Sequence, residues 1–186
     1  MKTLVTFIML LCSSSLLVAQ SLNKEIVLNN NQKILVGKFN KAGLTQSTNH
    51  PWFQKNYDDY TLDTNTISKF SKKLSTYHIK LFMGTWCGDS RREVPRFLKI
   101  LEHAKFPMEK LQMVAVDVRK DHYKKSPTGE EWGLQILRVP TIIFYKNGRE
   151  VNRIIETPNK TLEEDILAII QGNSYVPNKA TSLHFD

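Results

Sequence analysis

The chain has 186 residues, of which 41% are hydrophobic and 24% are charged, and its formal net charge at pH 7 is +8. This length suits one domain with a single core. The positive charge invites a nucleic-acid hypothesis, but the basic residues are scattered and no nucleic-acid-binding motif accompanies them, so the sequence argues against that class.

The first 19 residues are typical of a secretory signal peptide. Lys2 gives a positive start, an apolar run extends from Leu4 to Leu11, and the small residue Ala19 precedes the first polar stretch. Serines interrupt the apolar segment, which is shorter than the roughly 20 residues of a membrane-spanning helix. We therefore expect an exported protein, periplasmic or secreted, with no stable membrane insertion after removal of the signal.

Residues 20–60 form an N-terminal extension with weak patterning. Residues 25–28 and 34–39 resemble short strands, and the asparagines between them favour a turn. Residues 50–60 are aromatic and polar without a clear period, and we expect them to form an ordered loop packed on the domain.

From Thr61 to Gly172 the pattern becomes that of an α/β domain, and a C-terminal tail of residues 173–186 follows. Apolar residues at helical spacing predict helices at residues 67–74, 90–104, 130–136 and 162–170. Short apolar or β-branched runs predict strands at residues 79–83, 113–118, 141–145 and 151–155. The alternation predicts parallel strands joined by crossover helices, and Asn147-Gly148 predicts an antiparallel hairpin at the edge.

The last predicted helix has recognisable start and end residues, and the remaining aromatic and histidine side chains suggest no further site. Thr161 and Glu164 form a capping box before the helix, and Gly172 is placed to end it. Trp132 is expected in the core. The histidines show no metal-ligand spacing, so no metal site is predicted at His78, His103 or His122.

Cysteine usage points to a single reactive group. The chain contains Cys12 and Cys87, and Cys12 would leave with the signal peptide. Cys87 would then stand alone in a compartment that usually favours disulfides. Without an internal partner it is either a free thiol or pairs with another molecule.

Cys87 falls between an apolar strand and an amphipathic helix. The first turn of a helix offers unpaired N–H groups and the positive end of the dipole, and both favour a thiolate. Such positions lower a cysteine pKa from about 8.5 into roughly the 3.5–7.5 range. We expect Arg91 and Arg92 to add positive potential and the Ser90 hydroxyl to donate a hydrogen bond to the sulfur. The polar, turn-rich flanks argue against a cysteine that merely fills the core.

The segment Thr85-Trp86-Cys87-Gly88-Asp89-Ser90 resembles the active-site motif of the thioredoxin family, in which tryptophan precedes a Cys-Gly-Pro-Cys turn. Pro95 matches the proline that kinks the family's active-site helix, and Arg138-Val139-Pro140-Thr141 matches the segment with the family's cis-proline. The resemblance covers about residues 61–172. It implies an α/β, thioredoxin-like fold with a central mixed β-sheet flanked by helices, here preceded by an N-terminal extension.

The resemblance also implies a role for each matching residue. Cys87 would be the attacking thiolate, and Trp86 would shield it and line a substrate surface. Pro140 would have a cis bond and lie against the active-site turn, and Val139 would offer backbone groups to an extended substrate peptide. The surrounding site would be supported by Gly88, Asp89, Arg91 and Pro95.

Three departures from the family pattern limit these expectations. Ser90 occupies the place of the second cysteine, which would break a mixed disulfide, and serine cannot attack sulfur in this way. Asp89 replaces the usual proline and adds a negative charge near Cys87. Leu81 stands where many family members have a buried aspartate that carries protons.

The predicted function is therefore monothiol thiol-disulfide exchange, with Cys87 and Ser90 in the reactive turn and no cofactor. Its partners would be protein disulfides and thiols, or a small thiol such as glutathione, and an external thiol would resolve the mixed disulfide. Two alternatives remain. The fold could hold an extended peptide beside Val139 and Pro140 without catalysis, or Cys87 could be a redox sensor that is oxidised to sulfenic acid.

Overall fold

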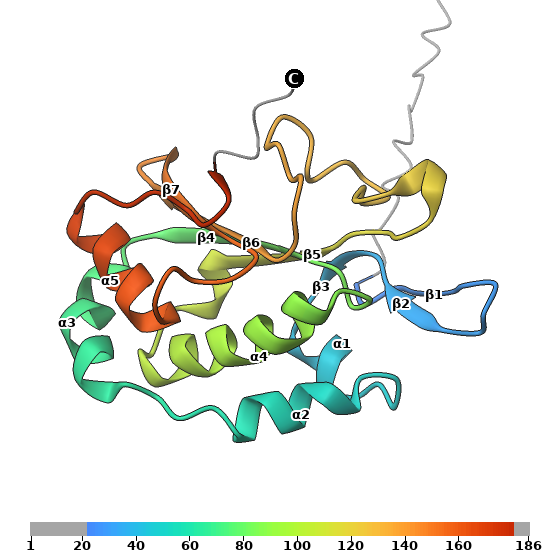
Figure 1. Ribbon diagram of the computed structural model, residues 1–186, viewed down its shortest axis with the longest axis horizontal. Helices are drawn as coiled ribbons and strands as arrows, with labels where there is room; N and C mark the ends of the chain where they lie inside the picture. Colours follow the sequence, from blue (N-terminus) through green and yellow to red (C-terminus); the bar gives the residue numbers. More distant parts are fainter. Residues whose placement is uncertain (1–21, 181–186) are drawn as a thin grey trace, which may run out of the picture.

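Short apolar and β-branched runs form the strands, and five of the strands pair into one central sheet (Figure 1). The computed structural model describes residues 22–180. The central sheet has the order β3-β5-β4-β6-β7, and β1 pairs with β2 in a separate hairpin. The strands span Glu25–Val27 (β1), Lys33–Leu35 (β2), Gly37–Phe39 (β3), His78–Met83 (β4), Leu111–Ala115 (β5), Thr141–Lys146 (β6) and Arg149–Ile155 (β7).

The pairing of the strands makes the sheet mixed. Strands β4 and β5 are parallel, with Ile79 opposite Leu111 at one end of the register. The other described pairs are antiparallel, and the β6–β7 hairpin turns through Asn147 and Gly148, whose φ angles are 51° and 76°. The predicted parallel pair, the hairpin and the mixed sheet are confirmed.

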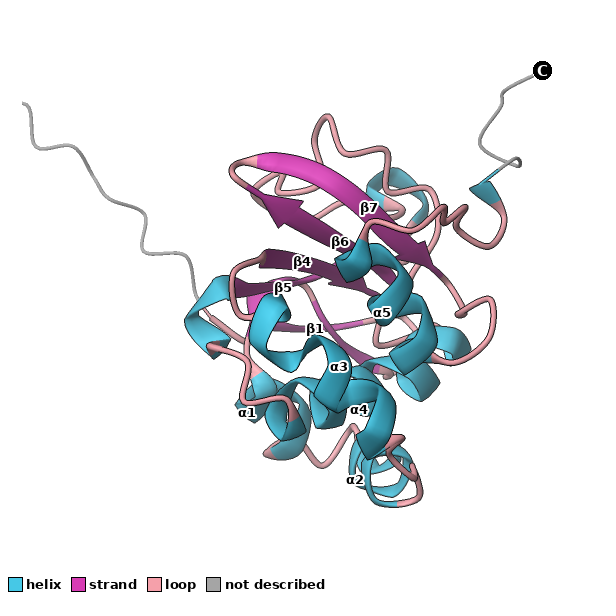
Figure 2. Cartoon of the chain, turned by 90° about the vertical axis from the view of Figure 1, so that its left-hand side faces the viewer, coloured by secondary structure: helices cyan, strands magenta, loops and turns pink. Residues whose placement is uncertain are grey.

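The helices pack on one face of the central sheet, while the chain between β5 and β6 crosses the other face (Figures 1 and 2). They span Lys41–Thr45 (α1), Pro51–Asp58 (α2), Thr64–Leu74 (α3), Gly88–His103 (α4) and Leu162–Gln171 (α5). The larger apolar cluster lies beneath the helices and includes Phe97 and Phe144, whose rings meet edge to face at 6.4 Å. A smaller cluster lies under the β5–β6 segment and contains Phe82 and Val139.

The N-terminal extension joins the sheet. Strand β3 forms one edge of the central sheet, and its Lys38 pairs with Val114 of β5. Helix α2 packs against α4, and the buried side chains of Leu44 and Phe53 belong to the larger apolar cluster. The segment before Thr61 therefore shares one core with the α/β domain that follows it. The predicted signal peptide, residues 1–19, lies outside the described residues, and so do residues 20 and 21 of the extension.

The ends of α5 form as the sequence predicts. The Thr161 hydroxyl accepts a hydrogen bond from the Glu164 backbone N–H at 3.1 Å, which satisfies one of the free donors at the helix start. At the other end, Gly172 has a φ of 79°, a left-handed conformation that glycine adopts without steric penalty.

The expectation of a loop at residues 50–60 is wrong, because Pro51–Asp58 form helix α2. Proline is suited to the first helical position, and Phe53 and Tyr57, four residues apart, stack at 5.9 Å along the face that meets α4. Two helical turns are too few to show a clear hydrophobic period, and tertiary packing rather than propensity stabilises so short a helix.

The expectation of a helix at residues 130–136 is also wrong, and this segment forms turns. Gly129, Gly133 and Gln135 have positive φ angles of 74°, 72° and 52°, which interrupt a right-handed helix. Trp132 is 79% exposed rather than buried. Its ring instead covers Gly129, where an added Cβ would lie 2.6 Å from the indole.

Within residues 22–180, no helix combines the length and the apolar character needed to cross a bilayer.

Candidate active site

The candidate site forms where β4 ends and α4 begins. Cys87 is the N-cap residue of α4, with extended backbone angles, and its carbonyl accepts the Arg91 N–H at 3.0 Å. The Cys87 N–H donates to the Gly84 carbonyl at 2.9 Å, which closes the turn between the strand and the helix. The sulfur therefore lies beside the first turn of a 16-residue helix, where backbone N–H groups lack helical partners.

The segment before β6 supplies the opposite wall of the site. The Val139–Pro140 peptide bond is cis, and the Cys87 thiol donates a hydrogen bond to the Val139 carbonyl oxygen at 3.1 Å. Val139 is buried, whereas Cys87 is partly exposed. The structure thus brings together Trp86, Cys87 and Val139, which pack in the same apolar cluster although 52 residues separate Cys87 from Val139.

Trp86 packs closely against the turn that carries Cys87. Its ring passes so close to Gly84 that an added Cβ there would lie 2.5 Å from the indole, so only glycine permits this approach. The indole N–H donates to the Val116 carbonyl at 2.9 Å, and the ring faces that of Tyr123 at 5.8 Å. Trp86 is therefore fixed at its polar atom and on one side of its ring.

The expectation that Ser90 donates to the Cys87 sulfur is wrong. The Ser90 side chain is fully buried, and its hydroxyl oxygen accepts the Gly84 backbone N–H at 3.2 Å. A residue on the first turn of a helix that follows a strand points back beneath the turn, and the nearest polar group there is a strand-end N–H. Ser90 consequently fixes the turn, while the sulfur turns to Val139.

The two arginines after the motif are occupied by other groups. Arg92 pairs with Asp89 at 2.7 Å and with Glu93 at 2.6 Å, so the negative charge of Asp89 is compensated within the helix. Arg91 donates from Nε to the Thr85 carbonyl at 2.6 Å. Pro95 lies inside α4 and is buried. Gly88, the first residue of the helix, has open space where a Cβ would point.

Acidic residues beyond β5 serve the local fold. Burial opposes ionisation of Asp117, but hydrogen bonds from the Arg119 side chain and backbone outweigh it and lower the pKa of this carboxyl below its ordinary value. In the described part of the chain, no group of three or more His, Cys, Asp or Glu side chains is arranged to hold a metal ion.

Several contacts around the site carried no sequence signal. Thr85 is buried, and its hydroxyl accepts the Leu35 N–H of β2 at 3.1 Å, a contact across 50 residues. Tyr123 lies in a polar segment that resembles an ordinary loop, yet it packs on Trp86. The ring centre of Trp52, on α2, lies 5.9 Å from the Arg91 guanidinium carbon. Only the folding of distant segments onto one turn reveals these contacts.

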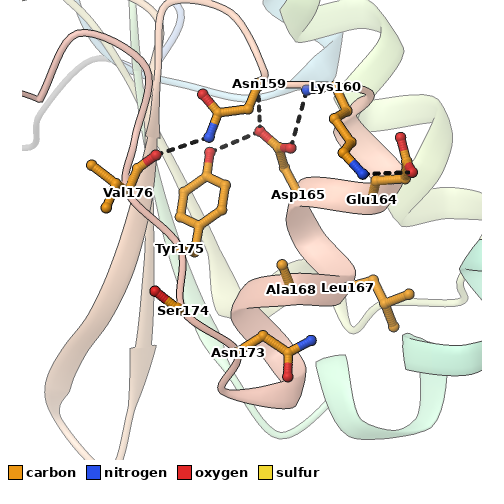
Figure 3. Close-up of a pocket in the computed structure, with 10 residues that line it drawn as sticks. All are labelled: Asn159, Lys160, Glu164, Asp165, Leu167, Ala168, Asn173, Ser174, Tyr175 and Val176. Atoms are coloured by element: carbon orange, nitrogen blue, oxygen red, sulfur yellow. Dashed lines mark hydrogen bonds and ion pairs between the residues drawn. The ribbon is translucent and has the colours of Figure 1, made fainter.

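A separate hollow of about 380 Å³ lies between α5 and the chain that follows it (Figure 3). The buried Asp165 carboxylate accepts hydrogen bonds from the Asn159 N–H at 2.7 Å and the Tyr175 hydroxyl at 2.8 Å. Burial and this carboxylate raise the pKa of Tyr175 above its ordinary value. The Asn159 side chain donates to the Val176 carbonyl at 2.8 Å. These bonds fasten the C-terminal segment to α5, and the hollow does not include Cys87.

The chain was compared with protein families and with individual proteins. The model of the family described as Thioredoxin matches residues 61–169. The H-type thioredoxin of Picea mariana is 31% identical over 88 residues, which are 47% of this chain and 62% of that protein. The TPR repeat-containing thioredoxin TDX of Arabidopsis thaliana is 26% identical over 107 residues, which are 57% of this chain and 25% of that protein. The chain thus spans less than two thirds of either relative.

Among solved structures, Fasciola hepatica thioredoxin is similar with 18% sequence identity and a TM-score of 0.35, over 57% of this chain and 89% of that one. Thioredoxin O2 from Arabidopsis thaliana is similar with 23% identity and a TM-score of 0.32, over 48% of this chain and 76% of that one. Because the family match extends over residues 61–169 of 186, more than half of the chain, this protein belongs to the thioredoxin family.

Proposed function

We propose that this protein is an exported monothiol member of its family, periplasmic or secreted, that exchanges thiols and disulfides through Cys87. The observation that carries the proposal is the position of the sulfur. Cys87 caps a long helix, is partly exposed, and lies 3.1 Å from the Val139 carbonyl at the end of the sheet. A thiolate there would meet the positive end of the helix dipole and the free N–H groups of the first turn.

The exchange proceeds in two balanced steps. The Cys87 thiolate attacks one sulfur of a substrate disulfide, so that a new S–S bond forms, the old one breaks, and the second sulfur leaves with the bonding electron pair. An external thiolate, such as that of glutathione, then attacks the substrate sulfur of the mixed disulfide and displaces Cys87 as a thiolate. The cycle rearranges disulfides or removes small-thiol adducts, and the protein itself is neither oxidised nor reduced overall.

The remaining residues of the site would bind and orient. Trp86, anchored through its indole N–H, would present its ring edge beside the sulfur as part of the substrate surface. The Val139 carbonyl orients the thiol before ionisation. Ser90 cannot displace a mixed disulfide, because a buried hydroxyl bonded to the Gly84 N–H is not a nucleophile toward sulfur. The external thiol is therefore an obligatory co-substrate.

Glutathione disulfide provides a direct test on the protein without residues 1–19. We expect the mass of the protein to rise by one glutathionyl group, one equivalent of glutathione to be released, and excess reduced glutathione to reverse the adduct. Cys87→Ala is the blank. A wild-type protein that forms no adduct, while denatured protein does, would overturn the proposal.

Turnover separates exchange from the two alternatives. In the presence of glutathione, we expect the wild type to accelerate the recovery of active ribonuclease from its scrambled form, and Cys87→Ala to lose that activity completely. A peptide-binding module would retain its partner after this substitution, because it needs no sulfur. A redox sensor would form sulfenic acid with peroxide but would not speed the recovery of ribonuclease.

Export is tested by the mass and location of the mature protein. We expect expression of the full chain in a bacterial host to yield a periplasmic product shortened by about 19 residues, as a cleaved signal peptide requires. A full-length product retained in the cytosol would contradict this part of the proposal.

A further inference from the structure

Helix α2 of the N-terminal extension, Pro51–Asp58, packs directly against α4, the helix that Cys87 caps. Two residues of α2, Trp52 and Asn56, contact Arg91, which lies one turn after the cysteine. Arg91 reaches in two directions, because its Nε donates to the Thr85 carbonyl at 2.6 Å and its guanidinium carbon lies 5.9 Å from the Trp52 ring centre. The guanidinium group therefore lies between the turn and the indole.

Asn56, on the same helix, makes a second contact with Arg91. Pro95 has no backbone N–H, so the Arg91 carbonyl four residues earlier lacks its ordinary helical donor. The Asn56 side-chain amide donates to that carbonyl at 3.2 Å and also to the Trp52 carbonyl at 2.9 Å. Helix α2 thus supplies the hydrogen bond that the proline removes from the first turns of α4.

The Trp52 ring is itself held firmly. His50 is 3% exposed and meets the indole edge to face at 5.4 Å, and Phe53, 1% exposed, meets it at 6.3 Å. A ring fixed in this way can restrict the guanidinium group, since a cation over an aromatic face is attracted by the ring quadrupole.

We infer that Trp52 and Asn56 are positioning residues for Cys87 and act through Arg91. The ring keeps the guanidinium group on the Thr85 carbonyl, the amide completes the helix at Pro95, and together they fix the turn from which the sulfur projects. Only the expected effect on the rate of thiol-disulfide exchange rests on the proposed function. The geometric content of the inference, that α2 sets the orientation of the Cys87 sulfur, is independent of the substrate.

The test measures the pH dependence of Cys87 alkylation by iodoacetamide and the rate of its reaction with glutathione disulfide. We expect Trp52→Ala to slow both reactions about tenfold near neutral pH, because small displacements of a reacting group produce losses of this order or larger. Trp52→Phe keeps an aromatic face and should retain most of the rate.

A double-mutant cycle distinguishes positioning from general packing. Arg91→Lys keeps the charge but loses the planar group that contacts both the carbonyl and the ring. If Trp52 acts through Arg91, the double variant should react no more slowly than the slower of the two single variants. Independent effects would instead multiply. Asn56→Ala provides a separate probe that leaves the Trp52 ring in place, and should also slow alkylation.

Tyr57→Ala is the matched control. Tyr57 also lies on α2 and packs on α4, but its hydroxyl bonds to Glu102, eleven residues beyond Arg91. We expect this substitution to lower stability and leave the alkylation profile within about twofold of the wild type, as for a substitution outside the coupled group. Equal alkylation profiles for folded Trp52→Ala, Asn56→Ala and Tyr57→Ala proteins would overturn the inference, and so would multiplicative effects of Trp52→Ala and Arg91→Lys. A wild type that reacts with iodoacetamide but not with glutathione disulfide would overturn the proposed function instead, and the alkylation cycle would still decide the inference.

Discussion

Ser90 stands one helical turn after Cys87, its side chain is fully buried, and its hydroxyl oxygen accepts the Gly84 N–H. A thiol in this place would lie beneath the turn, protected from solvent and near the sulfur that it would have to attack. The chain therefore lacks a dithiol cycle because Ser90 has an oxygen atom where a cysteine would have sulfur, and not because of its backbone geometry.

We expect Ser90→Cys to create dithiol reductase activity. The new thiolate can displace the substrate from Cys87 and form an internal disulfide, a step that serine chemistry forbids. Insulin reduction with dithiothreitol as the electron source measures the gain, and the wild type and Cys87→Ala/Ser90→Cys are the controls. Absence of any gain, in a variant whose two thiols both titrate, would count against the turn geometry.

His50 is a buried histidine. Burial lowers its pKa below the ordinary value, Glu25 and the Gly43 backbone only partly oppose this effect, and Arg91 adds to it. The folded protein therefore binds the proton less well than the unfolded chain does. The free energy of unfolding should therefore be highest, as far as His50 affects it, above the unfolded pKa of about 6.5. It should fall as the pH drops from there toward the lower folded pKa.

Urea unfolding of the wild type at pH 7.5 and pH 5.5 measures this effect. We expect the wild type to lose stability over this interval, and His50→Phe, which cannot take up a proton, to lose less. Carboxylates contribute little to the difference, because the carboxyl groups with lowered pKa, Asp63, Asp117 and Glu156, titrate below this range. Parallel pH slopes for the two proteins would contradict the assignment.

At the scale of elements, helix ends are specified locally. Helix α5 begins at the Thr161 cap, has acidic residues in its first turn, and ends at Gly172. Each device satisfies a backbone group or complements the helix dipole without help from distant parts of the chain. Helix α2 is the opposite case, because its His50 N-cap makes no side-chain cap bond and its packing on α4 holds it.

We expect Thr161→Ala to lower the free energy of unfolding by about 1 kcal/mol, since an N-cap hydroxyl typically contributes that much. Thr161→Ser should restore most of the loss because it keeps the oxygen that accepts the Glu164 N–H. Chemical denaturation of the three proteins provides the measurement. A loss as large for the serine variant as for alanine would show that the threonine methyl group, rather than the cap, matters.

At the scale of the whole molecule, the N-terminal extension and the family domain share one core. Phe53 is 1% exposed and belongs to the same apolar cluster as Phe97 and Phe144. Strand β3 closes one edge of the sheet, and the Leu35 N–H bonds to the Thr85 hydroxyl near the reactive turn. The extension and the domain should therefore unfold together.

We expect Phe53→Ala to destabilise the protein by about 3–5 kcal/mol, as truncation of a buried aromatic side chain does elsewhere. Unfolding should remain a single transition, with the same midpoint by tryptophan fluorescence and by far-ultraviolet circular dichroism. Two separated transitions would show that the extension is an independent unit. The exposed Lys69 offers a control, because Lys69→Ala on α3 should change stability by less than about 0.5 kcal/mol.

Much of the fold could be predicted from local pattern. A pattern within a few residues predicts each of these elements: the strands β4, β6 and β7, the amphipathic α4, the Asn147-Gly148 hairpin and the capped α5. The position of Cys87 between a strand and a helix also follows from such a pattern. These features depend on periodicity, capping and turn chemistry, which act between near neighbours in the chain.

The tertiary structure decided the rest. The direction of the Cys87 thiol toward Val139, the capture of Arg91 by Thr85 and Trp52, and the placement of Tyr123 on Trp86 join segments that lie far apart in the sequence. The same holds for β3, which reads as part of a weakly patterned leader yet forms the sheet edge. A side chain turns to the partner that folding brings nearest, and a sequence window does not contain that partner.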